Sequence, residues 1–74
     1  MPYNSKTFGL VISRLRIARG LSQETLSGLA GISRSHLAMI ETGRKTVRLD
    51  TLWKLADALS TRPSDLLAAC EPSP

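Results

Sequence analysis

Two helix starts of the same design follow one another between residues 21 and 41, and this stretch constrains the fold more than any other part of the chain. In the first start, Ser22 is placed to accept a hydrogen bond from an unpaired backbone N–H as the N-cap. Leu21 and Leu26 flank it at the positions of a hydrophobic staple. A helix is therefore predicted to begin at Gln23.

The second start repeats this pattern with Ile32, Ser33 and Leu37. Gly31 lies between the two starts, and glycine can adopt the left-handed conformation that closes a helix without a Cβ clash. The sequence therefore predicts two short helices, over residues 23–30 and 34–41, joined by a tight turn. That is the arrangement of a helix-turn-helix.

Three further helices are predicted around this unit. Apolar residues recur at the i, i+3, i+4, i+7 spacing from residue 5 to a point before Gly20, and a second apolar stripe runs along residues 49–59. The last helix begins at Pro63, because proline suits the first helical position. The predicted fold is an all-α, compact five-helix domain spanning residues 1–74, with its core at about 5–69 and flexible termini that include residues 1–4 and the proline-rich tail.

The interior of this bundle follows from the same spacing. Gly28 lies inside the predicted second helix, and a glycine there lowers the stability of the helix by roughly 1 kcal/mol relative to alanine. Either close packing against a neighbour or simple tolerance would explain its presence. The positions expected to face inward in the second, third and fourth helices are Leu26, Leu29, Ala30, Leu37, Ile40, Leu49, Leu52, Leu55, Ala56 and Leu59.

Composition limits the classes of function. A chain of 74 residues buries only about 60% of its unfolded surface, and no apolar run approaches the ~20 residues needed to span a bilayer. Without a signal-peptide pattern, a cytoplasmic protein is expected.

Cys70 has no second cysteine to pair with, and no Cys/His cluster predicts a metal site. The net charge of +4 favours a nucleic-acid partner as much as it favours solubility alone.

The segment QETLSGLAGISRSHLAMIETG resembles the Cro and phage-repressor type of helix-turn-helix regulator, the XRE family, and the resemblance extends from about Phe8 to Leu67. Within that family the chain is most similar to small stand-alone members such as the controller proteins of restriction-modification systems. The resemblance implies a lambda-repressor-like fold and a homodimer that binds a palindromic operator on double-stranded DNA. It also implies that the second helix of the motif enters the major groove.

Base contacts are expected from the outer face of residues 34–41. Arg34, at the helix start, is the leading candidate because it can span O6 and N7 of guanine; the alternative is a solvated surface arginine. Ser35 can donate to a base or a phosphate. Met39 could touch a thymine methyl or pack against the core. For His36, a solvent-facing position on the first turn is favoured over base contact.

Backbone contacts are expected from the two helix starts and from the loop after the second one. Gln23 and Ser33 lie where helix N-termini bind anions, and the resemblance supports this role for Gln23; Ser33 could instead be a cap alone. Thr42, Arg44 and Lys45 follow the recognition helix and are predicted to hold the sugar-phosphate backbone, with a solvated cationic loop as the alternative.

The resemblance also assigns structural roles. It implies an ion pair between Arg16, on the border of the first helix's apolar stripe, and Glu41. Family members commonly have serine where Arg48 stands and glycine where Ser60 stands, so both ends of the fourth helix are expected to be weakly capped.

Dimerisation is predicted through the last helix and the neighbouring end of the fourth. Leu66 and Leu67 are adjacent and point about 100° apart, so both can be buried only if the helix is covered on two sides. Trp53 is expected to join this interface. The alternative is that Leu67 or Trp53 is a scattered exposed apolar residue without a partner.

The leading interpretation is a sequence-specific transcriptional regulator that is not an enzyme and uses no cofactor, metal or small-molecule ligand. One histidine, one cysteine and six acidic residues, without a glycine-rich phosphate loop, give no recognisable catalytic site. The alternative is an antitoxin or adaptor module that holds a protein partner. An antitoxin usually carries a toxin-binding extension, and the few residues after Leu67 disfavour that reading.

Overall fold

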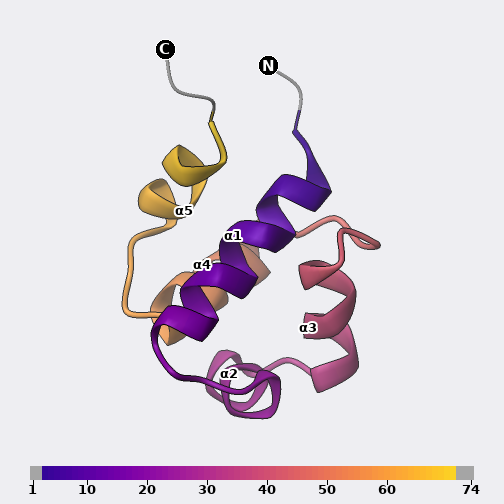
Figure 1. Ribbon diagram of the computed structural model, residues 1–74, viewed down its shortest axis with the longest axis vertical. Coiled ribbons are helices and arrows are strands. Elements are labelled where there is room, and N and C mark those ends of the chain that lie inside the picture. The colour runs from indigo at the N-terminus through magenta and orange to yellow at the C-terminus, as the bar shows by residue number, and fades with distance from the viewer. Residues whose placement is uncertain (1–2, 72–74) are drawn as a thin grey trace.

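Five helices make up the computed structural model, which describes residues 3–71 (Figure 1). Along these residues there is no strand, so the predicted all-α five-helix fold is confirmed. Residues 1–2 and 72–74, which belong to the termini expected to be flexible, lie outside the described residues. The helices are α1 (Ser5–Ala18), α2 (Gln23–Ala30), α3 (Arg34–Glu41), α4 (Leu49–Ala58) and α5 (Pro63–Cys70).

The helix-turn-helix forms as the local sequence predicts. Ser22 Oγ accepts a hydrogen bond from the backbone N–H of Thr25 at 3.0 Å, and Ser33 Oγ accepts one from His36 N–H at 3.0 Å. Between them Gly31 closes α2 in the left-handed conformation, with φ 70° and ψ 30°. Each cap satisfies a donor that the first helical turn leaves unpaired, so both helix starts are specified locally.

The core lies where α1 meets the other helices. α1 packs between α3 and α5, while α4 packs against α2 and α5. Figure 1 shows α1 crossing in front of α4, with α3 and α5 on opposite sides of it. The buried apolar residues are Phe8, Ile12, Leu26, Ala30, Leu37, Ile40, Leu52, Leu55, Ala56, Leu59 and Leu66.

Two residues expected in this core are exposed, so those predictions are wrong. Leu29 is 61% exposed, because the stripe that α2 turns inward contains Leu26, Ser27 and Ala30 and leaves Leu29 on the far side of the helix. Leu49 is 72% exposed, because it is the first residue of α4 and lies beyond the last core residue at that end.

The chain ends also differ from expectation where the structure describes them. Asn4, expected in the N-terminal arm, is the N-cap of α1, and its side chain accepts hydrogen bonds from the backbone of Lys6 at 3.0 Å and Thr7 at 3.2 Å. The ring of Tyr3 lies 6.4 Å from that of Phe8. At the other end, α5 includes Cys70, one residue beyond the expected limit of the core.

The two ends of α4 are as weakly capped as the departures from the family pattern suggest. The side chain of Arg48 at the N-cap makes no capping hydrogen bond. At the C-terminus Ser60 has a φ of 55°, the only positive φ of a non-glycine residue in the part of the chain that the structure describes. A left-handed residue with a Cβ is strained relative to glycine, so Ser60 costs stability at this turn.

Two glycines inside helices have opposite packing environments. A Cβ on Gly9 of α1 would collide with the backbone oxygen of Ile40 and would lie 2.6 Å from that of Glu41, so α1 and α3 approach closely only because Gly9 has no side chain. A Cβ on Gly28 of α2 would meet nothing within 4 Å. Simple tolerance, and not close packing, therefore explains Gly28.

We expect alanine at these two positions to change stability in opposite directions. Gly9→Ala should destabilise the fold by about 1–3 kcal/mol, as overpacking does where backbone atoms must move. Gly28→Ala should stabilise it by about 0.5–1 kcal/mol, because alanine restricts the unfolded chain and favours the helix. Urea unfolding of both variants measures the two free energies, and a Gly9→Ala protein as stable as wild type would contradict the close approach of α1 and α3.

Candidate nucleic-acid interface

The outer face of α3 carries the side chains that the sequence assigned to base contact. Leu37, Ile40 and Glu41 are buried on the inner side of this helix. By helical geometry Ser35 and Met39 lie opposite that side, and both are exposed. Met39 is 38% exposed, so of its two expected environments it occupies the surface and not the core.

Arg34 and His36 flank this outward line on the first turn of α3. Arg34 is exposed and forms no ion pair among the residues that the structure describes. His36 is half-buried; its backbone N–H donates to the capping Ser33, and its imidazole makes no hydrogen bond to the residues that the structure describes. Arg34 thus presents a cation at the tip of the helix, while His36 is partly withdrawn toward the core.

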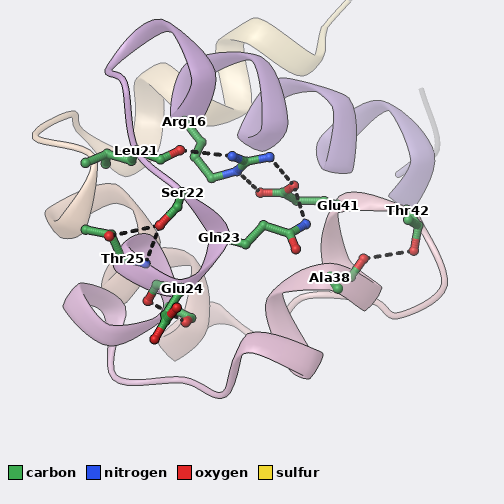
Figure 2. A network of polar contacts seen from close by, with 10 residues as sticks. Arg16, Leu21, Ser22, Gln23, Glu24, Thr25, Ala38, Glu41 and Thr42 are labelled. Carbon is green, nitrogen blue, oxygen red and sulfur yellow. Dashed lines mark hydrogen bonds and ion pairs between the residues drawn. The ribbon is translucent and has the colours of Figure 1, made fainter.

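A cationic loop follows α3. Arg44 and Lys45 are exposed and make no ion pair within residues 3–71. The hydroxyl of Thr42 donates to the carbonyl oxygen of Ala38 at 2.9 Å, so it can still accept, but not donate, a further hydrogen bond (Figure 2). The loop therefore offers two unpaired cations beside α3.

Lys6, which the sequence did not predict for this surface, adds a third cation beside the loop after α3. Gly43 has a φ of 75°, and a Cβ built on it would lie 2.7 Å from Cγ of Lys6, so the lysine stem lies against the loop. The hydroxyl of Ser5 also donates to the carbonyl oxygen of Gly43 at 3.0 Å. No local pattern signals this proximity, because it depends on how the start of α1 packs against the end of α3.

A network of charged and polar side chains holds α3 from behind (Figure 2). Arg16 Nε lies 2.7 Å from Glu41 Oε2, and Arg16 Nη2 donates to Glu41 Oε1 at 3.1 Å. The remaining guanidinium nitrogen, Nη1, donates to the carbonyl oxygen of Leu21 at 2.9 Å. The structure thus brings together the two residues that the family resemblance paired, and it extends the pair to the segment before α2.

This ion pair is well shielded from water. The side chain of Arg16 is 14% exposed and that of Glu41 only 5%. Hydrogen bonding to Glu41 raises the pKa of Arg16 above its ordinary value, against the opposing effect of burial. Every buried side-chain nitrogen or oxygen in the described part of the chain has a hydrogen-bond partner, so the charges are fully paired.

Gln23 belongs to the same network, which changes how it can meet DNA. Its Nε2 donates to Glu41 Oε1 at 3.0 Å (Figure 2). Only one amide hydrogen then remains for a phosphate, together with the backbone N–H groups at the start of α2. Ser33 accepts its capping hydrogen bond and keeps its own O–H for a second partner, so its two expected roles are compatible.

The residues predicted for a dimer interface divide into two groups. Leu66 is 1% exposed and packs in the core of its own chain, so its assignment to the interface is wrong. Leu67 is 45% exposed and Trp53 57% exposed. Tyr3 and Leu49, which the sequence did not assign to this surface, line a hollow of about 150 Å³ together with Leu67.

We call these four exposed residues, Tyr3, Leu49, Trp53 and Leu67, the apolar patch. Trp53 is one helical turn after Leu49 and so shares its face of α4. Exposed apolar groups gathered in this way distinguish the patch from scattered surface leucines.

Cys70, the one cysteine of the chain, is half-buried at the end of α5. The Cys70 thiol donates to the carbonyl oxygen of Leu66 at 3.2 Å, and burial raises its pKa, which disfavours the reactive thiolate. No group of three or more His, Cys, Asp or Glu residues in this part of the chain is placed to hold a metal ion. None of the five helices is long and apolar enough to cross a membrane.

The chain is similar to known proteins in sequence and in fold. The family HTH_3, described as helix-turn-helix, matches residues 12–66. The HTH-type transcriptional regulator y4dJ of Sinorhizobium fredii is 33% identical over 69 residues, which cover 93% of this chain and 90% of that protein. Control protein C.BamHI of Bacillus amyloliquefaciens is 34% identical over 61 residues, covering 81% and 75%. The structure of the restriction-modification controller protein C.AhdI from Aeromonas hydrophila matches with a TM-score of 0.82 and 44% identity, covering 84% of this chain and 94% of that one.

A double-mutant cycle on Arg16 and Glu41 tests the structural role of the ion pair. Arg16→Met should cost about 3 kcal/mol of unfolding free energy, because it leaves the Glu41 carboxylate buried without its cation. Adding Glu41→Met to that variant should recover part of the loss, since two apolar side chains leave no unpaired charge. Urea unfolding of the four proteins gives the coupling energy, and strictly additive losses would show that the two side chains do not stabilise one another.

Proposed function

This chain belongs to the helix-turn-helix family HTH_3, which includes transcriptional regulators, and from that premise we propose that it binds specific DNA sequences by placing α3 in the major groove. The observation that carries this proposal is the outer face of α3. There Ser35 and Met39 are exposed, with the exposed Arg34 beside them on the first turn, while Glu41 at the other end of the helix is held by the buried ion pair. Side chains reading base edges must be held in register, and this network provides a rigid support.

The three exposed residues suit different base edges. Arg34, on the first turn, can donate two parallel hydrogen bonds to O6 and N7 of guanine. Ser35 can bond to a base or to a phosphate, and Met39 can contact a thymine methyl. His36, half-buried, reaches a base only at the margin of this face.

Backbone contacts surround this face. The starts of α2 and α3, at Gln23 and Ser33, present backbone N–H groups and positive dipole ends to phosphates. Arg44, Lys45 and the neighbouring Lys6 add cations that bind phosphate by releasing condensed counterions. Thr42 is the first residue of this loop. Its hydroxyl already donates to the carbonyl oxygen of Ala38, so the side chain can accept a further hydrogen bond but cannot donate one to a phosphate.

Two of the similar proteins are controllers by name, C.BamHI and C.AhdI. This chain covers 94% of C.AhdI, so the likeness extends over nearly that whole protein and not over a motif alone. We therefore propose a stand-alone regulator of the same kind, acting in the cytoplasm where the DNA is, without enzymatic activity or cofactor.

Dimerisation through the apolar patch fits this function. A second copy related by a two-fold axis would cover Leu49, Trp53 and Leu67, which one chain leaves in water. Such an axis would present two α3 helices one duplex turn apart, roughly 34 Å, and would match a palindromic operator. The apolar patch is formed by Tyr3 and by residues of α4 and α5, so it does not overlap the outer face of α3.

Selection from a random DNA pool, followed by an arginine substitution, tests the DNA-binding proposal. We expect the selected sequences to share a palindrome. Arg34→Ala should then lower the ratio of specific to non-specific affinity by about 1–3 kcal/mol, the value of one bidentate guanine contact. Arg14→Ala removes an exposed arginine from α1 instead and should leave the ratio unchanged. The proposal fails if no sequence is enriched, and the role of Arg34 fails if the ratio is the same in both variants.

Sedimentation of the protein without DNA tests the dimer. The wild type should be a dimer at micromolar concentration, and Leu67→Glu should be a monomer, because it introduces a charge into the apolar patch. Leu29→Glu is the matched control, since it makes the same change at a leucine that is 61% exposed on α2. A dimer indifferent to the charge at position 67, or one broken equally by both variants, would place the interface elsewhere.

A further inference from the structure

A second hollow surface lies between α1 and α5. It encloses about 510 Å³, within the range of roughly 300–1,000 Å³ that ligand-binding sites occupy. Leu15 and Ala18 of α1 form one wall, and Leu66 and Ala69 of α5 form the other. We call this surface the α1–α5 groove.

The edge of this groove is unusually apolar for solvent-exposed helix. Leu10 is 51% exposed and Ile17 64% exposed. They share one face of α1 with Arg14, because the three residues are four and three positions apart. A single exposed leucine needs no explanation, but two large apolar side chains beside an apolar groove form a continuous strip.

The groove is accessible in the DNA-bound arrangement proposed above. In Figure 1, α5 and α3 lie on opposite sides of α1, so a duplex held by the outer face of α3 does not cover the α1–α5 groove. It also shares no lining residue with the hollow beside the apolar patch, so the two hollows are separate surfaces.

Charge in the groove favours one kind of occupant. Arg14 lines it and forms no ion pair among residues 3–71. Asp65 on the opposite wall pairs with the exposed Arg62 at 3.3 Å. The groove therefore offers one unpaired cation, Arg14, among apolar side chains. A partner surface that carries an acidic group among apolar side chains would complement it.

We propose that the α1–α5 groove binds an amphipathic helix of a partner protein that places a carboxylate opposite Arg14. A small molecule inside the groove would leave Leu10 and Ile17 in water, whereas a helix laid along it would cover both. The small side chains of Ala18 and Ala69 allow a partner backbone to come close. A second copy of this chain fits less well, because each copy would present a hollow to the other.

Two designed peptides test this proposal. Both are amphipathic helices of about 15 residues, the length at which isolated helices become stable in water, with the same leucine stripe. One carries glutamate beside that stripe and the other lysine. At low salt the glutamate peptide should bind the wild-type protein about tenfold more tightly than the lysine peptide, and Arg14→Glu should reverse the preference, since attraction and repulsion exchange places.

Two controls locate the binding. Lys54→Glu makes the same charge change on α4, outside the groove, and should leave the peptide preference as in wild type. Ile17→Asn should weaken both peptides alike, because it removes apolar contact from the edge of the groove without adding a charge. Amide chemical shifts on adding the glutamate peptide should change along α1 and α5, with operator DNA present or absent.

The proposal is overturned if the two peptides bind the wild type equally, if the preference survives Arg14→Glu, or if the shifts fall on α3 or on the apolar patch. Self-association of the protein without peptide, if Ile17→Asn abolishes it, would also overturn the proposal, in favour of a second copy as the occupant. Because the peptide measurements on protein alone involve no DNA, their failure leaves the DNA-binding proposal intact.

Discussion

A single buried carboxylate, that of Glu41, links α1, α2 and α3. Glu41 at the end of α3 accepts hydrogen bonds from Arg16 of α1 and Gln23 of α2, and Arg16 also binds the carbonyl oxygen of Leu21 ahead of α2. A buried charge without these partners would be strongly unfavourable, so arrangements of α3 that break the contacts are disfavoured. These hydrogen bonds therefore fix the orientation of α3 relative to α1 and α2.

The close approach of α1 and α3 acts in the same direction. Gly9 lets α1 come against the backbone of Ile40 and Glu41, and Ser5 donates to the carbonyl oxygen of Gly43 just beyond α3. Backbone packing at one end and the ion pair further along α1 restrain α3 at its C-terminal end. Its N-terminal turn, capped by Ser33, remains available to a ligand on the other side.

The fold separates three surfaces on one small chain. The outer face of α3, the apolar patch and the α1–α5 groove involve different side chains, although α5 contributes to both the patch and the groove. Adjacent residues on α5 illustrate how: Leu66 enters the core and forms part of the groove, while Leu67 points to the patch. The roughly 100° between successive helical positions makes this division possible.

The sequence by itself determined the local structure: α2 and α3 begin and end where the Ser22 and Ser33 caps and the glycine turn at position 31 predict, because caps and turns depend only on neighbouring residues. The outward positions on α3 followed from the same periodicity, and the pairing of Arg16 with Glu41 came from family resemblance. Only the tertiary structure decided that Leu29, Leu49 and Leu66 had been misassigned, that Gly9 is needed for contact, that Lys6 joins the cationic loop and that Gln23 binds Glu41. These properties depend on which helices meet and how closely they approach, and a pattern within one helix carries no information about its neighbours.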